Sequence, residues 1–228
     1  SGDNIFKKIN KNGECPLIIF YKYYKDKHYI DAEENIVLSL YFSEINTFVS
    51  DTGNTLLSYY ISSRESLASF KANYIQSFIP RNKSNLNLYN NENNLKIHII
   101  LKINFADIGS INYAHYFSLV ETLITDENIS MVDKDKYYPI QLYLKQIKAE
   151  ELISSKPITL LWKFCNPIFL NYKKNVSKET SLGIYLSRCT SPNNQIIDIL
   201  LTPKNIYISS ANKLPIQHYY ENSLIRHI

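Results

Sequence analysis

Glycine is scarce in this chain, which has five glycines among 228 residues, no two of them close together. Glycine supplies the positive φ angles and the close backbone approach that phosphate-binding loops, dinucleotide-binding turns and nucleophile elbows require. The scarcity therefore argues against most sites of those kinds. It also disfavours the alternative of a doubly wound parallel sheet, because the crossover turns of such a sheet use glycine.

Alternation of apolar and polar residues predicts β-structure in two regions. Residues 95–105 carry six apolar side chains at alternate positions among mostly polar ones, so we expect a strand with one buried face. The same pattern recurs near the C-terminus in residues 182–186, 196–201 and 206–208, with turn-forming residues at 191–194 and 202–205 between them. We therefore predict a C-terminal β-meander of tight hairpins.

Helical spacing appears elsewhere. Ser62 and Glu65 have the spacing of a capping box, and apolar residues then recur at helical spacing until Pro80. A second amphipathic helix is predicted for residues 111–124, and the composition of residues 144–154 favours a third. The predicted fold class is α+β: a largely antiparallel sheet, two or three amphipathic helices and the C-terminal meander.

Further strands are expected within residues 17–21, 36–49, 56–61 and 137–144, and further apolar runs occupy residues 158–164 and 168–172. We interpret residues 1–228 as one unit, with a candidate subdomain boundary near residues 154–157 that separates an α+β part (1–154) from a mostly β part (155–228). No repeat of fixed period is evident. Residues 82–94 hold seven asparagines and are predicted to form an exposed loop that folding does not require.

Charge and composition give weak guidance on partners. The formal charge of +4 is spread evenly and four of the cations are arginine, so nucleic acid is not the favoured partner. The excess of Asn, Lys, Ile and Tyr resembles AT-rich codon usage.

Three scattered cysteines predict reduced thiols in a cytoplasmic protein, and no apolar run is long enough to span a membrane. The chain starts with serine, which we interpret as a processed start or an expression remnant.

Histidines and acidic pairs are the candidate chemical groups. His98 is expected on the solvated face of the strand at 95–105, and His115 is expected to pack in a helix. His28 and His227 are expected at the surface. Asp31, Glu33 and Glu34 are expected to form either a helix start or an exposed acidic turn. Cys189, His218 and Asp198 have the residue types of a nucleophile, base and orienter, but a structural cysteine is favoured because nothing near Cys189 would lower its thiol pKa. Asp133 and Asp135 could share a divalent cation, although a solvated loop is favoured.

A cluster of tyrosine and lysine is the candidate binding surface. It consists of Tyr21, Lys22, Tyr23, Tyr24, Lys25, Lys27 and Tyr29. The cluster could be ordinary surface that reflects the codon bias, or it could be a binding face. As a binding face it favours a protein interface over single-stranded nucleic acid, because tyrosine supplies contact area at low entropic cost. We expect a non-catalytic subunit or adaptor that binds other proteins and needs no cofactor or metal. The alternatives are an enzyme that acts on nucleic acid or phosphoesters through dispersed carboxylates and lysines, and a nucleic-acid-binding module.

Overall fold

The fold is known from a computed structural model, which describes residues 8–12, 14–16, 19, 86–103, 113–146, 155–189, 192–209 and 212–224. These residues are 55% helical and 1% strand, and they form no sheet. The predicted α+β class is therefore wrong for the part of the chain that the structure describes, which is helical. The predictions for residues 36–49, 56–61 and 62–80 lie outside the described residues.

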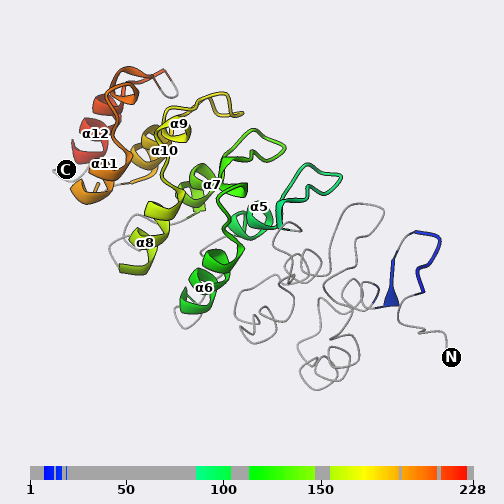
Figure 1. Ribbon diagram of the computed structural model, residues 1–228. Coiled ribbons are helices and arrows are strands. Elements are labelled where there is room, and N and C mark those ends of the chain that lie inside the picture. Colours follow the sequence, from blue (N-terminus) through cyan, green and yellow to red (C-terminus); the bar gives the residue numbers. More distant parts are fainter. Residues whose placement is uncertain are drawn as a thin grey trace. The chain divides into compact units, whose positions relative to one another are not determined.

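The described elements are mostly short helices (Figure 1). In chain order they are α5 (Lys96–Leu101), α6 (Tyr113–Leu123), η6 (Asn128–Ser130), α7 (Pro139–Gln146), α8 (Ser155–Phe164), α9 (Pro167–Leu170), α10 (Ser181–Arg188), α11 (Asn194–Leu200), η8 (Asn205–Tyr207) and α12 (Pro215–Leu224), where η marks a 3-10 helix. The chain forms two compact parts, the first made of residues 1–100 and 106–125 and the second of residues 101–105 and 126–228. Helix α6 confirms the helix predicted for residues 111–124.

Helix α5 replaces the clearest predicted strand. An alternating strand would leave Lys96, His98 and Ile100 on a mostly wet face, yet all three are buried, while Ile99 is half-buried. The run of six residues in α5 is apolar enough to fit a buried helix as well as a strand, because periodicity does not separate the two in so short a segment. The strand predicted for residues 95–105 was therefore wrong for its described residues, of which 96–101 form α5.

The predicted C-terminal meander is also helical. In α11 the buried side chains are Ile196, Ile199 and Leu200, which are the i, i+3 and i+4 positions of one helical face. The preceding Asn193 accepts a hydrogen bond from the backbone N–H of Gln195 at 2.8 Å, so it caps a helix instead of turning a hairpin. Residues 182–186 lie in α10, residues 206–208 largely in η8, and residues 137–144 largely in α7, so all of these strand predictions were wrong.

The second compact part is built around three helices in series. Helix α10 packs between α7 and α12, α8 packs on α7, and α11 packs on α10 (Figure 1). Tyr143 of α7 and Phe164 of α8 are among the largest fully buried side chains, and their ring centroids lie 5.4 Å apart. This aromatic contact holds α8 against α7.

The described part of the asparagine-rich segment, residues 86–94, is partly buried. Leu86, Asn90 and Asn94 are buried, so the expectation of an exposed loop was wrong for these residues. That folding does not require the segment stays a prediction. No described helix is both long and apolar enough to cross a membrane.

Burial of Lys96 gives a pH-dependent stability. Its Nζ donates a hydrogen bond to the carbonyl of Leu88 at 3.0 Å, and burial lowers the pKa of the Lys96 ammonium to about 8. A basic group whose pKa is lower in the folded than in the unfolded state lowers the free energy of unfolding at low pH. This loss disappears as pH rises toward the pKa of the unfolded state. Relative to Lys96→Met, the wild type should gain about 2 kcal/mol of unfolding free energy between about pH 7 and about pH 9.5.

Urea denaturation at several pH values checks this expectation, because the difference between two variants cancels the other titrating groups. Lys204→Met, a change at an exposed lysine, is the control and should show a flat difference. A flat difference for Lys96→Met as well would mean that the ammonium is solvated.

Candidate functional site

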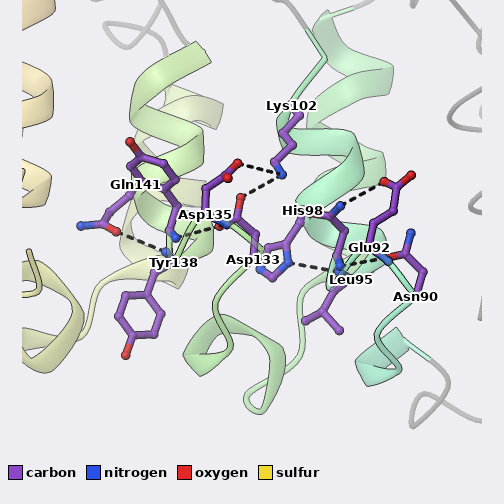
Figure 2. A network of polar contacts seen from close by, with 11 residues as sticks. Asn90, Glu92, Leu95, His98, Lys102, Asp133, Asp135, Tyr138 and Gln141 are labelled. Atoms are coloured by element: carbon purple, nitrogen blue, oxygen red, sulfur yellow. Dashed lines mark hydrogen bonds and ion pairs between the residues drawn. The ribbon is translucent and has the colours of Figure 1, made fainter. Parts of the chain in front are cut away.

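One turn recurs along the chain and precedes a helix each time. We number each turn from its first residue, the turn residue, as position 0. In the Asn90 turn the backbone N–H of Asn90 donates to the carbonyl of Asn94, and the Asn90 side-chain oxygen accepts from the N–H groups of Glu92 (3.1 Å) and Asn94 (2.9 Å) (Figure 2). The side chain thus closes the loop by binding positions +2 and +4.

The contact with position +4 recurs at three other turn residues, and the contact with the N–H of position +2 recurs at two of them. Asp133 accepts from positions +2 and +4 at 2.9 and 2.8 Å, and Asn10 does so at 2.9 and 3.0 Å. Asn175 accepts from position +4 at 3.0 Å and also donates its amide to the carbonyl there. A side-chain oxygen at position 0 is therefore a shared requirement of the turn.

Position +3 has a left-handed backbone in the four turns where the structure describes that position. The residues with positive φ are Asn93, Lys136, Lys178 and Asn212. By sequence, Gly13 holds this position after Asn10, and Ser209 holds position 0 before Asn212. Lysine and asparagine thus take backbone angles usually given to glycine, which costs on the order of 1 kcal/mol each.

A helix begins at position +6 in all five cases. The first residues are Pro16, Lys96, Pro139, Ser181 and Pro215. Proline suits this place because its fixed φ matches a helix and its missing N–H would have no partner there. We call each turn with its following helix a turn-helix repeat.

Position +8 caps the helix start in three repeats. Its side chain accepts the backbone N–H of position +5. The pairs are His98 with Leu95 (3.1 Å) and Gln141 with Tyr138 (3.2 Å), both in Figure 2, and Gln217 with Leu214 (2.6 Å). In the Asn175 repeat position +8 is Gly183, and its N–H donates to the Thr180 hydroxyl instead. These are the two halves of a capping box, distributed over the repeats.

The repeats are not evenly spaced. From position 133 to 175 the distance is 42 residues, and from 175 to 209 it is 34 residues. A search for one fixed period therefore misses them. The sequence does contain a signal for these repeats. Asn, Asp or Ser stands six residues before each helix start, and three of the five helices start with proline followed by Ile or Leu.

The exposed parts of the turns are positions +1 to +3, which we call the tips. They read Asn91-Glu92-Asn93, Lys134-Asp135-Lys136 and Val176-Ser177-Lys178 in three successive turns. Two neighbouring tips are joined, since the N–H of Val176 donates to the carbonyl of Asp135 at 3.1 Å and the N–H of Ser177 donates to the Tyr137 hydroxyl at 3.1 Å. The tips thus combine a fixed backbone with variable side chains.

The predicted Asp133 and Asp135 pair has a structural role. Asp133 is buried, with its Oδ1 bound to two backbone N–H groups and its Oδ2 2.9 Å from Lys102 Nζ, while Asp135 Oδ2 lies 4.0 Å from the same ammonium (Figure 2). Lys102 thus occupies the place that a cation would take between the two carboxylates. Among the described residues no group of three or more His, Cys, Asp or Glu side chains could hold a metal ion.

His98 is fully buried, and its Nδ1 acts as the helix-capping acceptor. The expectation of a solvated strand histidine was therefore wrong. His115 falls within α6, and His28, His227, Asp31, Glu33 and Glu34 lie outside the described residues.

The combination of Cys189, His218 and Asp198 does not have the form of a catalytic triad. Asp198 is exposed on α11, whereas an orienting carboxylate is usually buried against its histidine. Cys189 is buried at the end of α10 and its side chain hydrogen bonds to that of Tyr185. Burial raises the pKa of Tyr185, although the hydrogen bond that its hydroxyl accepts from the Asn193 N–H opposes this shift.

The predicted tyrosine and lysine cluster at residues 21–29 lies outside the described residues, so it stays a prediction. Neither protein-family models nor curated proteins give a match to this chain.

Proposed function

We propose that this chain is a repeat scaffold that binds other proteins through the tips of its turns. The supporting observation is that the turn backbone recurs while the tip side chains change. Position 0 is Asn, Asp or Ser in every repeat, whereas the tips differ in polarity and charge from one repeat to the next. A rigid frame that presents variable side chains suits recognition, because binding then orders few additional groups.

The order of elements in the repeat supports the same function. A β-turn followed by two helices resembles the ankyrin type of repeat, in which proline and leucine start the first helix. The pairs α7 with α8 and α10 with α11 follow this order, and Pro16-Leu17, Pro139-Ile140 and Pro215-Ile216 stand at the helix starts. Stacked repeats of this kind offer extended surfaces to their partners. The uneven spacing departs from the period of about 33 residues that is usual for ankyrin repeats.

The chemistry of the tips indicates the kind of partner. Lys134, Lys136 and Lys178 are exposed, and the exposed Val176 lies among them with 71% of its surface accessible. A protein surface with acidic groups around an apolar contact would complement these tips. We place this binding in a reducing compartment, since Cys15, Cys165 and Cys189 are all free thiols.

Site-specific photo-crosslinking tests the proposal. A crosslinking amino acid at Val176 or Lys134 should capture a partner in extracts of the source cells. The same group at Trp162 or Ile168, which are exposed on α8 and α9, should not. The captured partner is then titrated against the purified chain.

Introducing negative charge at two tip positions provides the quantitative result. Lys134→Glu combined with Val176→Glu should weaken binding of that partner on the order of tenfold or more, because both changes fall at the contact. Trp162→Glu combined with Ile168→Glu is the matched control and should leave the affinity unchanged. Equal loss in both pairs, or capture at the helix positions alone, would contradict binding through the tips.

A further inference from the structure

The hydrogen bond that joins two neighbouring tips also gathers exposed lysines. In this bond the N–H of Val176 donates to the carbonyl of Asp135 at 3.1 Å. Four exposed lysines lie within two residues of one end of the bond, and they are Lys134, Lys136, Lys174 and Lys178. Two residues span at most about 7 Å, so the Cα atom of each lysine lies within about one Debye length of the bond at physiological ionic strength. We call the bond and its four lysines the lysine junction.

Carboxylates near the lysine junction offset only part of its charge. Asp133 Oδ2 lies 2.9 Å from Lys102 Nζ, and Asp135 Oδ2 lies 4.0 Å from the same ammonium (Figure 2). These two carboxylates are therefore engaged by a lysine outside the tips. Residues 102, 133–136 and 173–179 together hold six lysines and three carboxylates, so positive charge dominates.

The next turn along the same compact part lacks this charge. By sequence, residues 209–212 include no charged side chain, and Lys213 forms an ion pair with Glu221 at 2.7 Å. The positive charge is thus local to two joined turns. A short acidic ligand fits it better than a long polyanion, whose affinity comes from many phosphate contacts along its length.

The tyrosine rings of these two turns are already packed against other side chains. Tyr138 stacks on Phe169 with 4.6 Å between ring centroids and meets Tyr172 edge to face at 4.7 Å. Tyr137 is buried, and Lys145 Nζ lies 4.2 Å from its ring centroid. Single-stranded nucleic acid binds by stacking its bases on accessible rings, so this arrangement does not favour it.

One exposed apolar side chain stands at the lysine junction. Val176 is the one apolar residue of the two tips, and 71% of its surface is accessible. Folded partners bury about 800 Å² on each side around an apolar core, which a single valine does not provide. A linear segment with one apolar residue between acidic residues complements a valine flanked by lysines.

We propose that the lysine junction binds a short, extended segment of the partner in which acidic residues flank one apolar residue. The apolar residue contacts Val176, and the carboxylates pair with the lysines. This inference rests on the proposed function and narrows it to one pair of tips and to a linear ligand. Because the charge pairs remain exposed to solvent, the affinity is modest and decreases with salt.

Fluorescence anisotropy with labelled synthetic peptides tests this proposal on the full chain. The probe is a peptide that has one leucine between two pairs of glutamates. It should bind, and its affinity should fall as ionic strength rises through about 0.15 M. A matched peptide with glutamine in place of glutamate should bind on the order of tenfold more weakly, and one with serine in place of leucine on the order of fivefold more weakly.

Neutralising two lysines of the junction should weaken binding of the probe. Lys134→Gln combined with Lys174→Gln should cost on the order of fivefold or more in affinity, because two charge pairs are lost. Lys163→Gln combined with Lys204→Gln removes the same charge at exposed positions elsewhere and should leave the affinity nearly unchanged. Equal losses in the two variants would mean that the peptide responds to net charge alone, which would overturn the proposal.

Val176→Ser tests the apolar contact. It keeps the N–H that joins the two tips and should weaken binding of the probe on the order of fivefold. The serine-containing peptide should bind this variant and the wild type equally, because the apolar contact is missing in both cases. Additive losses from the two changes would contradict the contact.

The remaining outcomes separate this inference from the proposed function. No binding of the probe at low salt, or tighter binding of a short single-stranded oligothymidylate, would overturn the inference. If a protein were captured by crosslinking at the tips while the probe failed to bind, the inference would fail and the proposed function would stand. Binding of the probe at the junction without any protein captured at the tips would support the junction and count against the proposed function.

Discussion

Asp133→Ala should lower the free energy of unfolding by about 2–4 kcal/mol, because it removes the acceptor for two backbone N–H groups and leaves Lys102 without its closest carboxylate. Asp133→Asn should cost only about 1 kcal/mol. It keeps the oxygen that closes the turn, as asparagine does at positions 10, 90 and 175, and loses only the ion pair. Urea denaturation at neutral pH measures both values.

Asp135→Ala is the matched control for Asp133. Asp135 is more exposed and lies 4.0 Å from the same lysine, so its loss should cost less than about 0.5 kcal/mol. If Asp133→Asn proved as damaging as Asp133→Ala, the ion pair and not the turn would be the stabilising feature.

Phe164→Ala should cost about 3–5 kcal/mol, whereas Trp162→Ala should cost less than about 1 kcal/mol. Phe164 is 1% exposed and packs against Tyr143, while Trp162 on the same helix is 59% exposed. Comparing these two substitutions also tests whether residues 162–164 form a helix or a strand. Residues two apart share a face in a strand and lie on nearly opposite faces of a helix. Similar costs for the two substitutions in urea denaturation would contradict the helical assignment of α8.

The helix at residues 113–123 was predictable because its apolar spacing extends over three turns. Helices α5 and α11 were not, because six or seven mostly apolar residues satisfy a strand pattern and a helix pattern equally well. What decides between them is the hydrogen bonding at their starts. The cap at Asn193 was interpreted as part of a hairpin turn at residues 191–194, although asparagine also begins helices.

The scarcity of glycine was a misleading guide to the turns. Left-handed backbone occurs at Lys136, Lys178, Asn93 and Asn212 without glycine, because the side-chain oxygen of the turn residue closes the loop in the turns at Asn90, Asp133 and Asn175. The asparagines that close the turns could not be told from the many others, because the excess of asparagine was attributed to codon usage. Asn128 and Asn205, which begin η6 and η8, are fully buried and belong to the same structural set. The proposed binding surface was therefore not predictable from composition.

The measurement that tests the turn-helix repeat most directly is the set of backbone chemical shifts and scalar couplings from NMR over the described residues. The structure predicts helical shifts through Lys96–Leu101, Ser181–Arg188 and Asn194–Leu200, with positive φ at Lys136 and Lys178, three residues before the helix starts of α7 and α10. Alternating extended shifts through residues 95–101 and 182–201, with negative φ at both lysines, would contradict it.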